Sequence, residues 1–495
     1  MSAAGDEYCL LRTAGPRFAQ LVGMPPTSFV RRVAAVTLAT VALVPAALTT
    51  SAAAASPTPP GTFTGTLADG ASWVIRVPDD WNGTLLLYSH GLVPPGQENP
   101  AVDSPDPITG GALLDNGYAL AGSSFATTGW AIEDALADQL ELLDVFADEV
   151  GHPSRTVAWG SSLGGLVTGA LLERHADRFD GGMAMCGVMA GGIGVWNTYL
   201  DSLFTLRTLL APDAGIDLVD ITDPFTDIDT VSQTLATAQQ TPAGRARIAL
   251  AAAVADIPGW IGADNPRPDP DDVATQEAAQ LEHFQTIVLF GLALRADVEG
   301  RAGGNPSSNI DVDYGGLLRD SSSRREVVDL YRQAGLDVRD DLDTLAAAPR
   351  IAADPGAVAY LEQFAVFDGE LRDPMLTLHT NGDQLAVVEH EQAYAETVER
   401  AGERRLLRQI FTERAGHCTF TPAETLTALG ALLDRIDVGR WADRLGADEL
   451  NDRAVGLGPV LNVHFDDESG GLVPTDPAFD DRRPAAFLRP YDFTE

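Results

Sequence analysis

The sequence has no lysine, so arginine supplies all 33 of its basic residues, against 71 aspartates and glutamates. The formal net charge at pH 7 is −38. Such an acidic chain is repelled by polyanions, which excludes nucleic acids and anionic membranes as partners. A surplus of carboxylates is typical of surfaces that keep a protein in solution, and we assign it no binding role.

Cysteine is scarce as well, because the 495 residues include only Cys9, Cys186 and Cys418. Cys9 lies in a segment that has the features of a removable leader. Its removal leaves an isolated pair of cysteines. In an exported protein such a pair favours one disulfide over the alternative of two buried free thiols.

Residues 1–55 have the composition of a secretory signal peptide. Twin arginines precede the apolar run in "RRVAAVTLATVALVPAALTT", and the small residues "SAAAAS" follow, with a predicted cleavage after Ala55. The stretch before Met24 is long and mixed for the start of a signal, so Met24 is a candidate true start. The alternative of an uncleaved membrane anchor is disfavoured by Pro45 inside the run. We therefore expect a secreted protein with no stable membrane association after cleavage.

Short apolar runs alternate with helical patterns over residues 56–190 and again over 373–440. Runs such as "TLLLYSHG" and "TVAWGSS" are typical of buried strands, whereas 131–150 has apolar residues at helical spacing. The alternation predicts an α/β fold with a mostly parallel sheet of about eight strands and helices on both faces. Residues 191–372 are helix-like and acidic, which predicts a helical cap inserted before the penultimate strand. Residues 441–495 are expected to form a C-terminal extension that wraps the surface.

A candidate nucleophile lies in "GSSLG", residues 160–164, which fits the pattern G-x-S-x-G with Ser162 at its centre. A strand is predicted before it and an amphipathic helix after it, as for a serine on a sharp strand-to-helix turn. Gly160 and Gly164 leave room for such a turn, and the positive end of the helix suits a developing oxyanion. Ser161 is the alternative, but only Ser162 has a glycine two residues away on each side.

A serine needs a base, and the base needs an orienting acid. "ERAGHCTFTPAE" places His417 in the loop after the last strand, and "LHTNGDQLAVV" places Asp383 in the loop after the preceding strand. Both therefore follow strand ends, where an open parallel sheet binds its ligands. The other histidines occur in helix or loop contexts with polar neighbours, except His379, which lies inside a strand and is expected to be buried and structural.

The motif "YSHGL", residues 88–92, follows another predicted strand. His90 and Gly91 allow a tight turn there, so that the next backbone N–H can point into the site. We therefore predict an oxyanion hole made by the backbone N–H groups of Leu92 and Leu163, with His90 as a structural turn residue.

The four motifs "YSHGL", "GSSLG", "HTNGD" and "AGHCTF" stand in the order and at the structural places of the α/β-hydrolases, which the chain resembles over residues 61–190 and 374–436. The resemblance implies a serine hydrolase that works through an acyl-enzyme, with Ser162, Asp383 and His417 as its triad. It implies no metal or organic cofactor. The Asp-rich stretch 213–229 lacks the ligand spacing of a calcium loop.

The pair His417–Cys418 is also similar to secreted feruloyl-esterase and tannase-like enzymes, in which the cysteine after the base histidine is bonded to one beside the nucleophile. Here Ser161 occupies the place of that second cysteine. A disulfide would therefore join Cys418 to Cys186, which ends the strand next to that of the nucleophile.

A cap as large as residues 191–372 would enclose a small or medium acyl substrate. We therefore predict a carboxylic-ester hydrolase that acts on a small molecule. The alternative is an exopeptidase of the same fold, similar to capped aminopeptidases, whose acidic cap would bind a free amine. Within the cap, residues 277–298 are expected to form a packed helix, with a mobile lid helix as the alternative.

Overall fold

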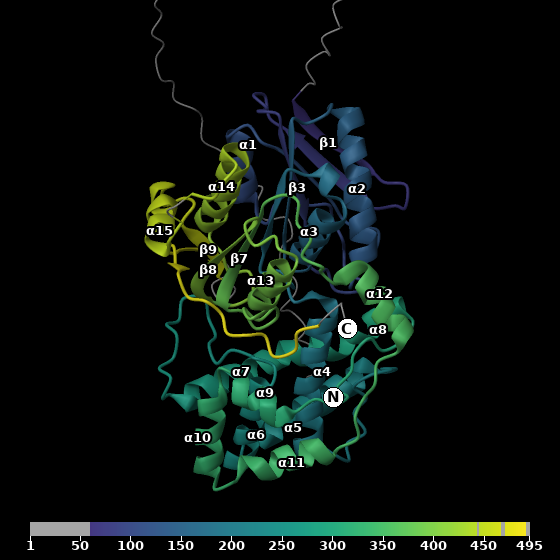
Figure 1. The fold of residues 1–495 in the computed structure, drawn as a ribbon, viewed down its shortest axis with the longest axis vertical. Coiled ribbons are helices and arrows are strands. Elements are labelled where there is room, and N and C mark those ends of the chain that lie inside the picture. Colours follow the sequence, from purple (N-terminus) through teal and green to yellow (C-terminus); the bar gives the residue numbers. More distant parts are fainter. Residues whose placement is uncertain (1–59, 443–444, 467–470, 492–495) are drawn as a thin grey trace, which may run out of the picture. The chain divides into compact units, whose positions relative to one another are not determined.

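The structure is a computed structural model that describes residues 60–442, 445–466 and 471–491 (Figure 1). The predicted leader, with Cys9 and the candidate start at Met24, lies outside the described residues. No helix in the described ranges is both long enough and apolar enough to span a bilayer.

One large sheet organises the chain, and it confirms the predicted α/β fold. Its nine strands have the order β1-β2-β4-β3-β5-β6-β7-β8-β11. Neighbours from β4 to β8 pair in parallel, whereas β1, β2 and β11 join antiparallel at the two edges. The strands are β1 (Gly61–Thr66), β2 (Ser72–Val77), β3 (Thr84–Ser89), β4 (Ala119–Ser123), β5 (Arg155–Ser161), β6 (Gly181–Met185), β7 (Met375–Gly382), β8 (Leu407–Ala415) and β11 (Phe479–Asp480).

Helices cover both faces of the sheet because successive side chains of its buried strands point to opposite sides. Leu85 and Leu87 of β3 belong to a core shared with α2, α3 and α13, whereas Leu86 and Tyr88 belong to a second core shared with α1, α14 and α15. These helices are α1 (Pro107–Asp115), α2 (Ile132–Glu149), α3 (Leu163–Arg174), α13 (His390–Arg400), α14 (Pro422–Val438) and α15 (Ala447–Gly456).

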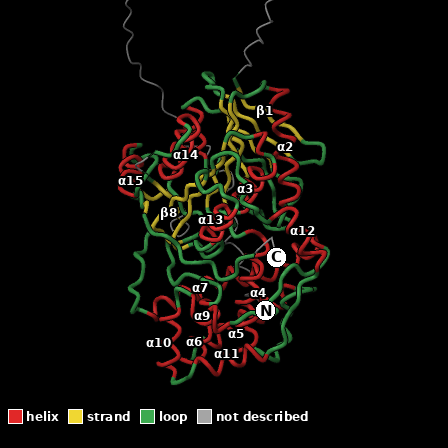
Figure 2. Tube along the Cα trace, in the orientation of Figure 1, coloured by secondary structure: helices red, strands yellow, loops and turns green. Residues whose placement is uncertain are grey.

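Between β6 and β7, a stretch that the structure describes throughout, the chain forms helices and no strand. Figure 2 shows these helices gathered beyond one end of the strands, where the cap was expected. Pro224, Pro242 and Pro355 each stand at the first position of a helix, where a missing N–H costs nothing. The cap helices are α4 (Gly191–Leu210), α5 (Pro224–Ala238), α6 (Pro242–Ala253), α7 (Val273–Leu289), α8 (Arg295–Ala302), α9 (Tyr314–Asp320), α10 (Arg324–Ala334), α11 (Val338–Ala347) and α12 (Pro355–Ala365).

The segment predicted to be a packed cap helix, 277–298, runs through α7 into α8 by way of a π-helical turn, Phe290–Leu294. Phe284, Val288 and Leu292 on it are fully buried. The segment is therefore a packed helix in this structure rather than a detached lid.

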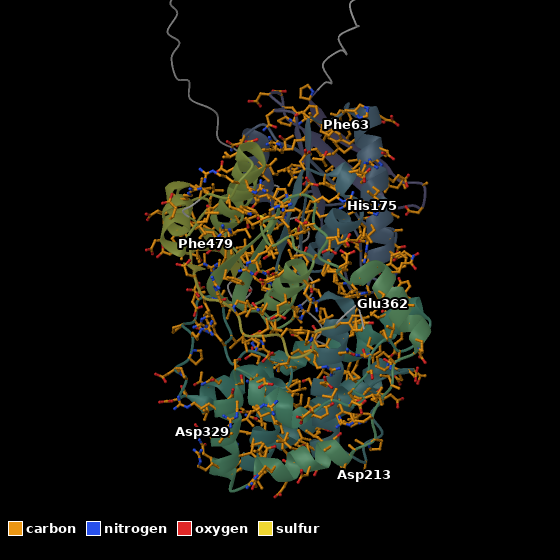
Figure 3. All side chains as sticks on the ribbon, in the orientation of Figure 1. Phe63, His175, Asp213, Asp329, Glu362 and Phe479 are labelled. Atoms are coloured by element: carbon orange, nitrogen blue, oxygen red, sulfur yellow. A yellow bond between two sulfur atoms is a disulfide. The ribbon has the colours of Figure 1, made fainter. Side chains whose placement is uncertain are left out.

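The C-terminal extension does more than wrap the surface. Its strand β11 pairs with β8 and adds a ninth strand to the about eight that were expected. Before β11 the extension forms a separate antiparallel sheet of two strands, β9 (Val463–Asp466) and β10 (Gly471–Pro474). Beyond β11 the chain reaches the cap, where Phe487 is buried and Arg489 forms an ion pair with Asp201 of α4. The hydroxyl of Tyr491 donates a hydrogen bond of 2.6 Å to Glu362 of α12, which is labelled in Figure 3. The segment therefore ties the cap to the edge of the sheet (Figure 1).

Candidate active site

Ser162 stands alone between β5 and α3, on the sharp turn that its motif predicts. Its backbone has φ 58° and ψ −120°, a left-handed conformation that L residues rarely adopt. The flanking glycines are required there, because a Cβ on Gly160 would lie 2.4 Å from the Gly164 carbonyl oxygen. A Cβ on Gly164 would lie 1.9 Å from the carbonyl oxygen of Ser89. The tight packing of β3, β5 and α3 thus projects the Ser162 side chain from the sheet.

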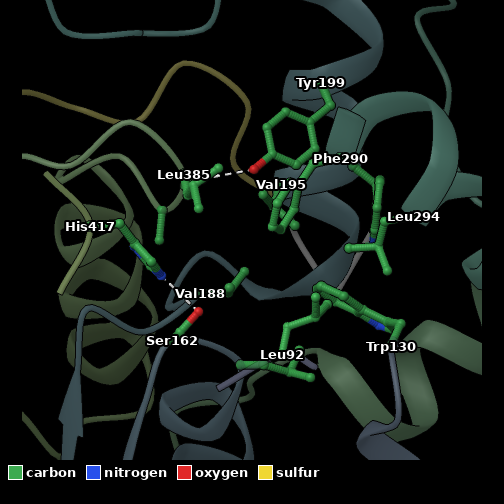
Figure 4. A pocket seen from close by; sticks show the side chains of 13 residues that line it. Leu92, Trp130, Ser162, Val188, Val195, Tyr199, Phe290, Leu294, Leu385 and His417 are labelled. Atoms are coloured by element: carbon green, nitrogen blue, oxygen red, sulfur yellow. Dashed lines mark hydrogen bonds between the residues drawn. The ribbon is translucent and has the colours of Figure 1, made fainter. Parts of the chain in front are cut away.

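The structure brings Ser162, His417 and Asp383 together, although they come from distant parts of the chain. The Nε2 atom of His417 lies 2.7 Å from Oγ of Ser162 (Figure 4), and its Nδ1 lies 2.7 Å from Oδ2 of Asp383. Because the carboxylate only accepts, Nδ1 carries the proton and Nε2 accepts the serine hydroxyl hydrogen. This is the arrangement of a nucleophile, a base and an orienting acid.

Asp383 is completely buried and is held by its own loop. Its Oδ1 accepts the backbone N–H groups of Leu385 and Ala386 at 2.8 and 3.0 Å. Burial alone would raise the pKa of Asp383, but attraction to His417 and hydrogen bonds from His379 and His417 lower it below the ordinary value. The carboxyl is therefore ionised at neutral pH and fixed in orientation.

The two N–H groups predicted to form the oxyanion hole belong to residues that line the pocket with Ser162, namely Leu92 and Leu163. Leu163 begins α3, so its N–H has no intrahelical acceptor. A Cβ on Gly91 would lie 3.3 Å from that of Ser162, which brings the chain before Leu92 against the serine. Neither N–H donates a hydrogen bond to another group in the described part of the chain. Their role in an oxyanion hole stays a prediction.

His90 has the surroundings of a turn residue, as predicted. It is buried, and its ring nitrogens lie 2.6 Å from the carbonyl oxygen of Gly91 and 3.0 Å from that of Ser124. The ring stacks on Phe125, with centroids 4.0 Å apart. Burial lowers the pKa of His90, and the contacts of the ring join the ends of β3 and β4.

The structure joins Cys186 to Cys418 by a disulfide, with the Cα atoms 5.3 Å apart. Cys186 directly follows β6, and Cys418 directly follows His417. Both cysteines have a positive φ, as Ser162 does. Strained backbone of this kind persists only where the surrounding structure holds it. The bond thus anchors the loop of His417 to the strand beside the nucleophile.

Replacement of Cys186 and Cys418 with alanine together is expected to lower the free energy of unfolding by about 3 kcal/mol, since the bond closes a long loop. We also expect a lower kcat, because the loop of His417 loses its anchor. Urea denaturation midpoints and ester turnover measure the two effects. Midpoints equal to those of the wild type would show that the bond does not stabilise the fold.

The pocket above Ser162 is walled by apolar side chains from both the cap and the sheet loops (Figure 4). The cap supplies Val195, Trp196, Tyr199, Phe290 and Leu294. The sheet side adds Leu92, Trp130, Val188 and Leu385. The Tyr199 hydroxyl donates a hydrogen bond of 3.0 Å to the Leu385 carbonyl oxygen, so cap and acid loop meet over the site.

The cap residues of this wall were not predicted from the sequence, although their spacing carries a weak signal. Val195 and Tyr199 are four residues apart, as are Phe290 and Leu294, which places each pair on one helix face. The second pair lies in the π-helical turn, a distortion that is frequent at functional sites. Such spacing is equally typical of core residues, so it identifies a pocket only after the cap is folded.

The sheet order, the serine turn at the end of β5 and the histidine loop after β8 define the class of this protein, which is an α/β-hydrolase. The model of the prolyl oligopeptidase family matches residues 121–212, the part that contains the serine turn. The chain is also 30% identical over 419 residues to o-phthalyl amidase from Xanthobacter agilis, an alignment that covers 78% of this chain and 89% of the amidase. The chain therefore belongs to the family of α/β-hydrolases that includes this amidase, which confirms the resemblance stated from its motifs.

Two solved structures show more distant likeness. Feruloyl esterase B from Aspergillus oryzae is 15% identical, with a TM-score of 0.36 over 77% of this chain and 81% of the esterase. Acylaminoacyl peptidase from Pyrococcus horikoshii is 9% identical, with a TM-score of 0.34 over 80% of this chain and 44% of the peptidase. Likeness at this level assigns no substrate.

Proposed function

We propose that this α/β-hydrolase cleaves a carboxylic ester with an uncharged, apolar acyl group, through an acyl-enzyme on Ser162. The observation that carries the proposal is the continuous pair of hydrogen bonds from Ser162 to His417 and on to Asp383, opening into an apolar pocket.

The mechanism follows from these positions. Oγ of Ser162 attacks the ester carbonyl carbon while Nε2 of His417 takes the hydroxyl proton, and Asp383 stabilises the imidazolium that forms. The N–H groups of Leu92 and Leu163 stabilise the negative charge on the carbonyl oxygen. His417 then donates its proton to the departing alkoxide. A water molecule, deprotonated by the same nitrogen, hydrolyses the acyl-enzyme and releases the acid.

The pocket wall supports an uncharged acyl group. Among the described residues that line it there is neither a carboxylate nor an arginine, and its polar side-chain groups are those of Ser162, His417 and Tyr199, together with the indole N–H groups. A charged acyl group would lose its water there without gaining an ionic partner, which is costly. For the same reason we do not favour the aminopeptidase alternative, because the pocket lacks a carboxylate for a free amine.

Amide hydrolysis is the second candidate, because the relative that is 30% identical is named as an amidase. The acyl-enzyme chemistry would be the same, and only the leaving group would differ. An amide nitrogen must be protonated as it leaves, and Nε2 of His417 is the group that can do so. The pocket supports the proposed acyl group, whereas the choice between an ester and an amide depends on the leaving group, and both are tested below.

The test compares nitrophenyl valerate with nitrophenyl hemiglutarate, which have acyl chains of equal length and differ in a terminal carboxylate. We expect kcat/KM to be about 100-fold higher for the neutral ester. The charged ester loses about 3 kcal/mol of transition-state stabilisation, because its carboxylate is buried without a partner. Activity is expected in the culture medium, because export is part of the proposal and is supported by the composition of residues 1–55.

The matched valeryl nitroanilide and an aminoacyl nitroanilide complete the series. Valeryl anilide turnover equal to that of the ester would favour the amidase candidate. Faster cleavage of the aminoacyl anilide than of either valeryl compound would contradict the proposal and favour an exopeptidase.

A further inference from the structure

His379 is a buried histidine that lies behind the proposed triad acid. It stands on β7 and is fully buried. Its Nδ1 lies 2.9 Å from Oε1 of Glu391, at the start of α13. Its Nε2 lies 2.6 Å from the carbonyl oxygen of Ala386 and 3.4 Å from Oδ2 of Asp383. That same carboxylate oxygen accepts the hydrogen bond from His417. The Asp383 carboxylate thus lies between two imidazole rings.

The hydrogen bonds around this ring require a proton on Nε2 and favour one on Nδ1. Nε2 faces a backbone carbonyl oxygen, which only accepts. Nδ1 faces Glu391, whose other oxygen already accepts from the hydroxyl of Thr377 and, at 2.6 Å, from the amide of Gln409. We take Glu391 as an anion whose Oε1 accepts from Nδ1, since Oε2 already accepts from the other two donors. The ring therefore carries a positive charge and donates on both sides.

We propose that His379 is a positioning residue whose permanently protonated ring, paired with Glu391, holds the Asp383 carboxylate toward His417 and balances its charge. The inference rests on the proposed triad. Glu391 and His379 form a neutral pair, so the buried network around His417 has one net negative charge, that of Asp383. Without the positive ring, the buried carboxylates of Asp383 and Glu391 would have no cation between them.

The charges on this network agree with its geometry. Burial alone would lower the pKa of His379, but the hydrogen bonds to Asp383 and Glu391 raise it to about 10. Burial lowers the pKa of His390, the first residue of α13, to about 3, so this neighbour is neutral. From the cap, burial lowers the pKa of His283 and raises that of Tyr199, which leaves both neutral near pH 7.

Glu389 is the neighbour that titrates in the working range, since burial raises its pKa to about 7. The group would contribute its own step to a pH profile, and its charge acts on His379. The variant Glu389→Gln therefore has to be measured in parallel, so that this step is known and can be separated from the one predicted below.

The first test measures kcat/KM against pH for His379→Gln and for the double variant His379→Gln/Glu391→Gln. In the single variant we expect the acidic limb to move up by about one pH unit, because the uncompensated carboxylates promote protonation of the base or of its acid. In the double variant, which removes both charges of the pair, we expect the limb to return to the wild-type position. A merely structural role would lower stability or kcat without moving the limb, and that result would overturn the proposal.

The second test measures the protonation of the His379 ring by NMR and does not depend on catalytic turnover. In wild-type protein labelled with ¹⁵N-histidine, the His379 ring is expected to stay protonated on both nitrogens at pH 8. A neutral tautomer there would overturn the proposal. Because this spectrum does not depend on ester hydrolysis, it separates a failure of this inference from a failure of the proposed function.

Discussion

The variant Ser162→Ala is expected to turn over nitrophenyl esters about 10⁶-fold more slowly than the wild type, and adding His417→Ala is expected to cost nothing more. The reason lies in the single relay that the structure shows. His417 acts on the hydroxyl hydrogen of Ser162 at 2.7 Å, so once that hydroxyl is removed the base has no proton to take. The residual rate comes from the oxyanion hole and the pocket. Steady-state kinetics on the single and double variants measure both statements.

The neighbouring serine supplies a matched control. The Oγ atom of Ser161 accepts a hydrogen bond of 3.1 Å from the hydroxyl of Tyr88, in the core on the other face of the sheet. Ser161→Ala is therefore expected to cost about 1 kcal/mol of stability and to leave turnover near the wild-type value. If Ser161→Ala abolished ester turnover and Ser162→Ala kept it, the assignment of the nucleophile would be reversed.

The strands, their parallel arrangement and the juxtaposition of Ser162, Asp383 and His417 could be predicted because each has a local cause. A buried parallel strand is a short apolar run, and the chain leaves every such strand at the same edge of the sheet. Residues placed just after three strand ends, as Ser162, Asp383 and His417 are, must then lie near one another. The glycines of the serine turn are local as well, because they follow from the strained backbone that they flank.

Features that depend on distant partners could not be predicted. Strand β11 has only two residues, and it depends on pairing with β8, where the backbone N–H of Glu413 donates a hydrogen bond of 2.7 Å to the carbonyl oxygen of Ala478. Helix α1 was missed for a different reason, because its two glycines weaken the helical pattern of the sequence. Only the cap residue Asp106 with Pro107 marks its start.

His379 shows the same limit at the site. Its place inside an apolar strand correctly predicted burial. Its charge, however, depends on Glu391, which reaches it from the next helix, and on Asp383 in the loop between them. The pocket wall is likewise assembled from cap helices whose packing no local pattern describes.

Gly164→Ala is expected to destabilise the fold by at least about 3 kcal/mol, because the new methyl group meets only backbone atoms that cannot swing away. The added Cβ would lie 1.9 Å from the carbonyl oxygen of Ser89 and 2.6 Å from that of His90. The clash is relieved only if α3 moves away from the end of β3. That movement would separate Leu92 from Ser162, so kcat is expected to fall about 100-fold as the oxyanion donors lose their alignment. Thermal midpoints and ester kinetics measure the two losses.

Gly430→Ala separates this effect from the ordinary cost of changing a helical glycine. Gly430 also lies in a helix, α14, but a Cβ there would have no atom within 4 Å. Alanine at this position is therefore expected to stabilise the protein by about 0.5–1 kcal/mol, since it restricts the unfolded chain and clashes with nothing. If the free energy of unfolding fell for Gly164→Ala and rose for Gly430→Ala, packing against β3, and not helix propensity, would be the reason for glycine at position 164. A stable and active Gly164→Ala protein would contradict the tight contact between β3 and α3 on which the geometry of the Ser162 turn depends.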